Sequence, residues 1–182
     1  MVDWDKEAYR ARVAHVFQSG EDASELNGTL EHAIIVIEEA MRAAKASIKL
    51  LSTRLDPACY ENDAIRTAVR AFLCRPGTQL EILVEQTSPG CPSCDEGTFL
   101  ATAFAVGGDR VRVAAVPANY VEDYSFNFLT VDGESYRFEN DRRFPLAIVQ
   151  GGPSAWGTAQ HLSKLFDRLF AVSTPIALAP AA

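Results

Sequence analysis

Histidine is scarce in this sequence, with only His15, His32 and His161 among 182 residues. We expect His32 and His161 to lie outside the apolar stripes of their helices, and all three histidines to be solvated surface residues. None of them has a partner at the spacing of a catalytic triad or of a metal-binding pair. The histidine content therefore argues against a triad hydrolase and against a histidine-based metal site.

Long hydrophobic runs are also missing from the chain. The longest apolar run covers residues 33–37, which is far too short to cross a bilayer. The first residues, MVDWDK, are acidic and contain no apolar core of the kind that a signal peptide needs. We therefore expect no membrane partner and a cytoplasmic location.

Basic residues are outnumbered, because 17 lysines and arginines face 24 aspartates and glutamates, which gives a formal net charge of −7. A surface of that sign repels the phosphate backbone, so nucleic acid is not an expected partner. One group of basic residues could form a local positive face, but the acids at 139, 141 and 167 favour an ordinary salt-bridged surface. The members of this group are Arg137, Arg142, Arg143, Lys164 and Arg168.

The four cysteines lie at positions 59, 74, 91 and 94, and without an export signal we expect thiols or ligands rather than disulfides. Cys91 and Cys94, in a loop rich in glycine and proline, could bind one zinc ion. No second Cys-x-x-Cys or His-x-x-x-His motif completes four ligands, however. A redox dithiol is another alternative, because Cys94 lies near an expected helix start. We favour plain loop cysteines and no cofactor, and keep zinc on Cys91 and Cys94 as the alternative.

Amphipathic segments alternate along a chain that is 48% hydrophobic and 23% charged, as in an ordinary globular domain. Apolar residues at helical spacing predict helices at 3–17, 29–45, 62–73, 95–106 and 154–170. Short apolar or alternating runs predict strands at 48–53, 80–84, 111–113, 126–131, 135–139 and 146–149. Asp132-Gly133-Glu134 predicts a hairpin turn, and Thr29 and Ser154 are the expected N-caps of two helices.

The order of these elements predicts the fold class. Strands alternate with helices before a closing hairpin, which indicates an α/β domain with a mixed β-sheet flanked by helices. The chain contains no internal repeat and no linker, so we expect a single domain. Its parts are an N-terminal helix and loop at 1–28, the α/β domain at 29–175 and a flexible tail at 176–182.

Residues 125–133, with the sequence SFNFLTVDG, carry the one motif that points to a family. The stretch resembles the His-x-Lys-x-x-x-x-Asp motif of phospholipase D enzymes, in which an apolar strand leads to the aspartate and glycine usually follows it. On that spacing Asp132 matches the aspartate. Ser125 stands at the histidine position, however, and Asn127 stands at the lysine position.

Other segments resemble the same family, so that the resemblance covers about residues 29–175. Residues 44–60 resemble the opening strand and loop of such domains, residues 80–84 resemble the second strand, and the final helix resembles the closing one. The resemblance implies one half of a phospholipase D-like fold, whose site usually forms from two motifs supplied by two halves or two subunits. We therefore expect a homodimer or a complex with a partner protein.

The substituted motif positions decide the activity that the resemblance implies. In the family, the histidine attacks phosphorus and the lysine steadies the phosphate oxygens, whereas Ser125 has no visible base and Asn127 brings no positive charge. We therefore expect no catalytic residue, and a non-catalytic module that binds proteins or regulates them. One alternative is a phosphodiesterase or nuclease with a rebuilt site, using a base near Ser125 or a metal held by Asp132 and neighbouring acids. The other alternative is a structural zinc protein.

Overall fold

The computed structural model describes residues 5–85, 98–122, 124, 126–141, 143–144 and 146–177 of the chain. The helices are α1 (Lys6–Gln18), α2 (Leu30–Ala43), α3 (Pro57–Tyr60), α4 (Asp63–Leu73), α5 (Phe99–Gly107), α6 (Ala118–Val121) and α7 (Pro153–Val172), with a 3-10 turn at Gly108–Arg110. The strands are β1 (Ala23–Asn27), β2 (Ser47–Ser52), β3 (Gln79–Val84), β4 (Val111–Ala115), β5 (Asn127–Val131), β6 (Ser135–Glu139), β7 (Ala147–Gly151) and β8 (Thr174–Pro175).

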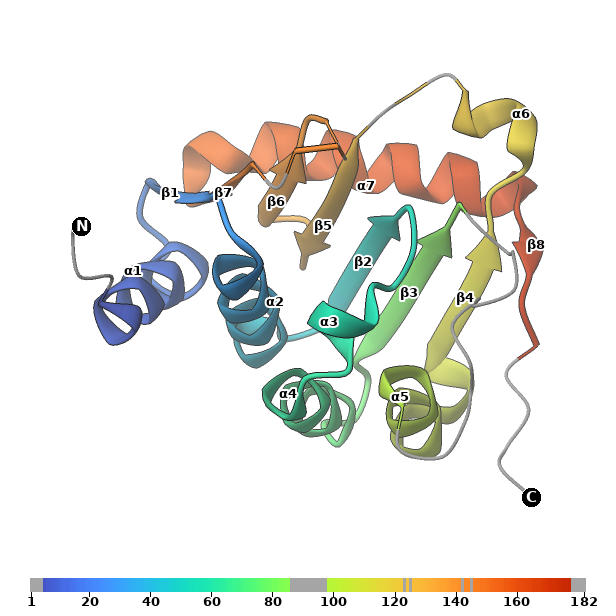
Figure 1. Cartoon of the computed structure of the whole chain (residues 1–182), viewed down its shortest axis with the longest axis horizontal. Coiled ribbons are helices and arrows are strands. Elements are labelled where there is room, and N and C mark those ends of the chain that lie inside the picture. Colours follow the sequence, from blue (N-terminus) through green and yellow to red (C-terminus); the bar gives the residue numbers. More distant parts are fainter. Residues whose placement is uncertain are drawn as a thin grey trace.

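A single mixed sheet forms the middle layer of the molecule, with the strand order β1-β7-β6-β5-β2-β3-β4-β8. Strands β2, β3 and β4 are parallel to one another, whereas β5, β6, β7 and β1 are antiparallel to their neighbours. Helices α1, α2, α4 and α5 lie along one face, and the long helix α7 crosses the other (Figure 1). The predicted α/β class with a mixed, helix-flanked sheet is confirmed.

Local sequence signals explain most of these elements. The Thr29 side chain accepts a hydrogen bond from the backbone N–H of His32 at 3.1 Å, which caps α2 as predicted. Asn62 caps α4 in the same way through the N–H of Ala64, at 2.9 Å. The predicted hairpin turn is also present, since Glu134 N–H donates to the Val131 carbonyl and links β5 to β6.

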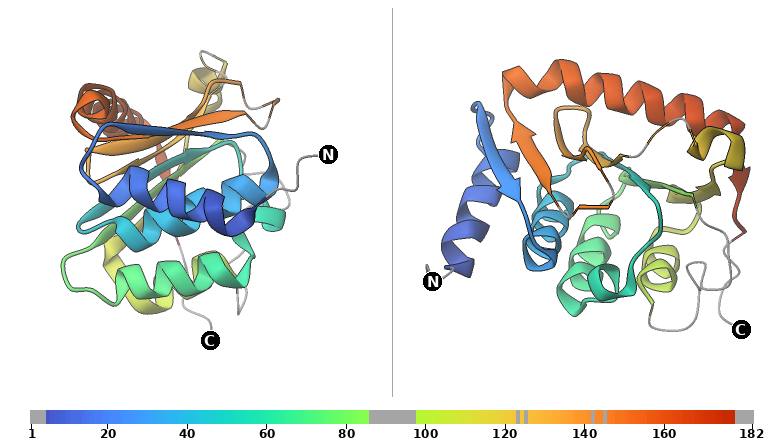
Figure 2. Two further views of the ribbon diagram at one scale, coloured as in Figure 1. Left: turned by 90° about the vertical axis from the view of Figure 1, so that its left-hand side faces the viewer. Right: turned by 45° about the horizontal axis from the view of Figure 1, so that its top comes forward.

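Strand β1 was not predicted, because a loop was expected where it lies. It forms the edge of the sheet and pairs in antiparallel fashion with β7, as Figure 2 shows. Its sequence, ASELN, lacks an apolar alternation, and Leu26 is 64% exposed. Pairing with β7 therefore stabilises this strand, and a pattern read along the chain does not reveal it.

Helix α7 also begins differently from the prediction. Its first residue is Pro153, and Gly152 occupies the N-cap position, so Ser154 is not the cap. The backbone N–H of Ser154 instead donates to the carboxylate of Asp22, at 2.7 Å. A side chain 132 residues earlier thus satisfies one of the free N–H groups of the first turn.

The hydrophobic core lies on both faces of the sheet. Phe72 and Phe99 are fully buried on the face that α2, α4 and α5 cover. Phe128 of β5 and Phe166 of α7 are fully buried on the other face. A smaller cluster packs α1 against α2 and β7, and includes Val13. Within the described ranges, no helix has the length and apolar character needed to span a membrane.

We expect Gly151→Ala to destabilise the protein by about 2 kcal/mol, because a Cβ atom at this position would lie 2.0 Å from the Val16 backbone oxygen of α1. The measurement is the free energy of unfolding in urea. Gly157→Ala is the matched control, since a Cβ there meets no atom within 4 Å in the interior of α7 and should stabilise by about 0.5–1 kcal/mol. Equal effects of the two substitutions would contradict the close packing of α1 on β7.

Candidate functional site

A cavity of about 410 Å³ opens at one end of the strands, where β2 ends and β5 begins. This is the carboxyl end of the parallel strands, where open α/β sheets commonly bind ligands. We call it the cleft. Its lining residues come from β1, α2, β2, the loop to α3, α3, β5 and β6, and the polar ones at its base are Asn27, Ser52, Thr53, Asn127, Arg137 and Glu139.

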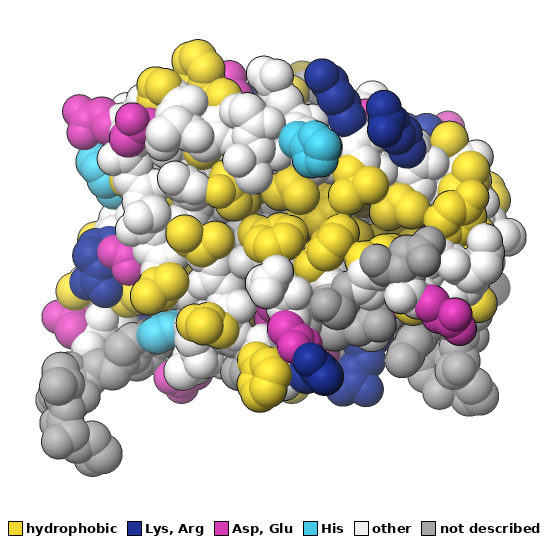
Figure 3. Space-filling view, turned by 90° about the horizontal axis from the view of Figure 1, so that it is seen from above, with side chains coloured by type: hydrophobic (Ala, Val, Ile, Leu, Met, Phe, Trp, Pro, Cys, Tyr) yellow, Lys and Arg dark blue, Asp and Glu magenta, His cyan; other side chains and the backbone are white. Residues whose placement is uncertain are grey.

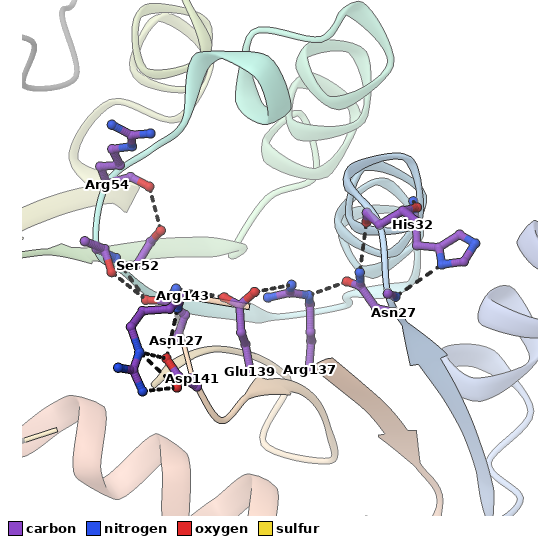
Figure 4. A network of polar contacts seen from close by, with 12 residues as sticks. Asn27, His32, Ser52, Arg54, Asn127, Arg137, Glu139, Asp141 and Arg143 are labelled. Carbon is purple, nitrogen blue, oxygen red and sulfur yellow. Dashed lines mark hydrogen bonds and ion pairs between the residues drawn. The ribbon is translucent and has the colours of Figure 1, made fainter. Parts of the chain in front are cut away.

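The register of four strands places three of these polar residues in one row. Asn27 pairs with Ala147, Ala147 with Glu139, and Glu139 with Asn127. Directly paired residues point to the same face of a sheet, so this row faces α2 and α3. Arg137 lies two residues before Glu139 on β6, and its guanidinium group contacts both Asn27 and Glu139 of this row (Figure 4).

Asn127 stands at the lysine position of the motif and uses both ends of its amide group. The Oδ1 atom accepts from the backbone N–H of Thr53 at 3.0 Å and from the Thr53 hydroxyl at 3.2 Å. The Nδ2 atom donates to Oε2 of Glu139 at 2.8 Å. The side chain of Asn127 is therefore a neutral amide that is held against a carboxylate.

Arg137 and Glu139 form a charge pair at the base of the cleft. Nη2 of Arg137 lies 3.5 Å from Oε1 of Glu139, and Nε of Arg137 donates to Oδ1 of Asn27 at 2.7 Å. The two side chains are only 11% and 13% exposed. At the rim, Arg54 pairs with Asp56 at 3.2 Å. Among the described residues, the lining of the cleft thus contains two guanidinium and two carboxylate groups, whose formal charges cancel.

One wall of the cleft is apolar. Leu30, Ala33 and Ile37 come from α2, and Cys59 and Tyr60 come from α3. Burial raises the pKa of the Cys59 thiol to about 12, and burial likewise raises the pKa of Tyr60 above its usual value. Both groups are neutral near pH 7, so Cys59 does not supply a thiolate nucleophile to the cleft.

Asp132 lies at the opposite end of β5 from Asn127 and outside the cleft. Its carboxylate accepts three backbone hydrogen bonds, from Lys45 at 2.7 Å, Ala46 at 2.8 Å and Ser47 at 2.7 Å. Its φ of +55° is in the left-handed region, which aspartate tolerates in a tight turn. The contacts tie the β5–β6 turn to the junction between α2 and β2, so the aspartate has a structural role.

The described part of the chain does not bring metal ligands together. No three histidine, cysteine, aspartate or glutamate side chains in it are arranged to hold a metal ion. Cys91 and Cys94 lie outside the described residues, as does Ser125, so zinc binding and the histidine position of the motif stay predictions. Asp132 is a poor candidate for a metal ligand, because three N–H donors already occupy its carboxylate oxygens.

Two structures of phospholipase D type and one chromatin protein share this arrangement of elements. Nuc from Salmonella typhimurium, a phospholipase D family member, matches 86% of this chain and 99% of its own, with a TM-score of 0.57 and 12% identity. NucT from Helicobacter pylori matches 86% of this chain and 100% of its own, with a TM-score of 0.55 and 11% identity. The archaeal chromatin protein TrmBL2 has a TM-score of 0.59 and 13% identity over 84% of this chain.

The chain has a phospholipase D-like fold. At these identities the phospholipase D-like structures establish the fold and not the activity, because one fold serves many functions. The chain spans about half of TrmBL2, namely 53% of that protein's length. No protein-family model matches the sequence, and no curated protein matches it either.

The basic residues that were grouped in the sequence separate in the phospholipase D-like fold. Arg137 lies in the cleft, whereas Lys164 and Arg168 belong to α7 on the other face of the sheet. Arg143 pairs with Asp141 at 2.6 Å, as in an ordinary salt-bridged surface. The described residues of the group therefore form no common positive face.

The histidines differ in one respect from the prediction. His15 and His161 are exposed, as expected for solvated residues. His32 is instead half-buried, with its ring stacked on Tyr9 at 4.1 Å between centroids, and its Nδ1 atom accepts from the N–H of Gly28 at 3.2 Å. These contacts hold α2 against α1 and give His32 a structural role.

Sequence reasoning missed the central pair of the cleft. Arg137 and Glu139 were interpreted as surface residues, although their spacing of two on a predicted strand places both on one face. Asn27 could not be found, because its strand was not predicted. Thr53 was expected at a strand end, but no sequence signal connected it to Asn127.

We expect Asp132→Ala to lower the free energy of unfolding by about 2 kcal/mol or more, because three backbone N–H groups lose their acceptor. Urea denaturation measures the change. The control is Glu134→Ala, which removes an exposed carboxylate from the same turn and should change stability by less than about 0.5 kcal/mol. If both substitutions have the same small effect, Asp132 does not hold the turn.

Proposed function

We propose that this chain is a non-catalytic phospholipase D-like domain that works as a binding or regulatory module. The observation that carries the proposal is the state of Asn127, whose amide is held between Thr53 and Glu139. The negative oxygens of a phosphodiester transition state are stabilised by positive charge placed beside them. At this position it would meet a neutral amide backed by a carboxylate, which repels a phosphate.

The charge balance of the cleft supports the same conclusion. Its two arginines each face a carboxylate, so the described part of its lining carries no net positive charge to attract a phosphate group. The aspartate that a rebuilt, metal-dependent site would use is held by backbone donors at the far end of β5. A rebuilt phosphodiesterase would therefore have to supply its cation and its metal ligands from residues other than these.

Solved structures with this fold do not all have the same role. They include a phospholipase D family member and a chromatin protein that binds DNA. The fold thus accommodates different functions on one scaffold. We do not propose DNA binding for this chain, because its net charge of −7 opposes contact with phosphates.

We expect no phosphodiester hydrolysis by the purified protein. The substrates are bis(4-nitrophenyl) phosphate, phosphatidylcholine vesicles and single-stranded DNA, each with and without magnesium or zinc ions. Release of nitrophenol, choline or shortened DNA would be compared with the variants Asn127→Ala and Ser125→Ala. Turnover by the unchanged chain that either variant abolishes would overturn the proposal, because it would show a working site at the motif.

The proposed module is a homodimer that pairs through the face on which α7 lies. A groove of about 490 Å³ on this face is lined by Tyr120, Tyr124, Phe126, Leu165, Arg168, Leu169 and Val172. Figure 3 shows apolar side chains gathered in a band across the same face. Contiguous exposed apolar surface of this kind marks association sites, and a twofold axis would bring two identical bands together. The resemblance to domains whose halves pair favours a second copy as the occupant, but pairing through this face would not join the two motif positions into one site.

We expect the chain to have twice its monomer mass in solution, and Val172→Lys to convert it to a monomer. Val172 is 49% exposed in the groove, and a positive charge there would be buried in the dimer beside Arg168, with no carboxylate among the described lining residues. Light scattering at several concentrations gives the mass. Leu26→Lys is the control, because Leu26 is an exposed apolar residue on β1 and outside the groove. A monomeric unchanged chain would rule out the homodimer.

A further inference from the structure

We propose that the cleft binds a small zwitterion, namely an α-amino acid with an apolar side chain. This inference rests on the proposed function of the chain as a binding module and names the ligand class of its cleft. In the proposed complex, the ligand carboxylate contacts Arg137, the ligand ammonium contacts Glu139, and the side chain lies against the apolar wall of α2.

The base of the cleft carries two opposite charges with a fixed direction. On the outer side of Arg137, the Asn27 amide accepts from Nε at 2.7 Å, and on the outer side of Glu139, the Asn127 amide donates to Oε2 at 2.8 Å. These amides orient the charged groups but cannot neutralise them. Asn127 is itself held by Thr53, so the whole row is ordered before any ligand binds.

The contact between the two charges is loose. Nη2 of Arg137 lies 3.5 Å from Oε1 of Glu139, which is long for a charge-assisted hydrogen bond. Each side chain is nevertheless nearly buried, at 11% and 13% exposure, and a buried charge is stabilised by close pairing. A ligand with a carboxylate and an ammonium group would give each of them a second, closer partner without breaking the contacts to the amides.

The charge balance of the cleft selects against ligands with a net charge. A phosphate or a dicarboxylate attracted by Arg137 and Arg54 would also be repelled by Glu139 and Asp56, and a polyamine attracted by the two carboxylates would be repelled by the two arginines, so neither gains net attraction. A zwitterion has no net charge and matches the direction of the pair. Electrostatic complementarity of this kind provides specificity as well as affinity.

The apolar wall of the cleft would contact the side chain of the ligand. Leu30, Ala33 and Ile37 project from one side of α2 into the cavity and carry no polar group. A cavity of about 410 Å³ is within the range of small-molecule sites, which combine apolar walls with a few convergent polar groups. A large aliphatic or aromatic side chain would cover this wall, whereas the side chain of glycine would leave it exposed.

Isothermal titration calorimetry on the full chain tests the inference with L-leucine and L-phenylalanine as probes. We expect saturable binding of at least one of them. Two analogues of leucine each lack one charge: 4-methylpentanoate has no ammonium group, and 3-methylbutylamine has no carboxylate. The affinity of each analogue should be lower than that of leucine by about tenfold or more, because one buried charged group then loses its ligand partner.

Glu139→Gln is the decisive variant, since it removes the charge and keeps an oxygen that can accept from Asn127. We expect it to weaken amino-acid binding about tenfold or more while the thermal unfolding midpoint shows that the protein is folded. Glu134→Gln is the matched control, because it makes the same change at an exposed position in the turn at the far end of β5 and β6. It should leave binding unchanged.

Three results would overturn the ligand class: no binding of either amino acid, equal binding of leucine and its one-charge analogues, or unchanged binding by Glu139→Gln. None of these affects the proposed non-catalytic function, which fails only if the chain turns over a phosphodiester. The two proposals are therefore tested separately.

Discussion

Three hydrogen bonds from backbone N–H groups to the Asp132 carboxylate hold β5 in register with β2. In this register Leu51 lies opposite Phe128, which brings Asn127 beside Thr53 at the far end of the strand. A shift by one residue would turn the side chain of Asn127 to the other face. The row of polar residues at the base of the cleft therefore depends on Asp132, which lies five residues after Asn127 in the chain. Asp132 is thus needed for the strand register even if the chain has no catalytic nucleophile.

The charges of the cleft are balanced among its described residues, with two arginines and two acids. Arg137 and Glu139 face each other between two amides, and the rim repeats the balance with Arg54 and Asp56. Burial makes such pairs favourable only when each charge keeps close partners, and the long contact between Arg137 and Glu139 leaves this condition partly unmet. This electrostatic pattern is the basis of the proposed ligand-binding and non-catalytic role.

The two faces of the sheet carry different features. The face beneath α2 and α3 holds the cleft, and the face beneath α7 holds a separate apolar core and an exposed apolar band. A second copy on the α7 face would leave the cleft of each copy open at the edge of its sheet. Binding in the cleft and pairing through α7 are therefore compatible, because they use different sides of one rigid layer.

The sequence by itself determined the alternating helices and strands, the mixed α/β class and the Asp132-Gly133 turn, because apolar periodicity, caps and turn residues act over a few neighbours. It also determined that Asn127 brings no charge to the motif. Only the tertiary structure decided three features: strand β1, the cap that Asp22 supplies to α7, and the row from Asn27 to Asn127. Each joins residues far apart in the chain, such as Asp22 with Ser154 and Asn27 with Arg137. Their partners are chosen by strand register and packing, which no local pattern along the chain encodes.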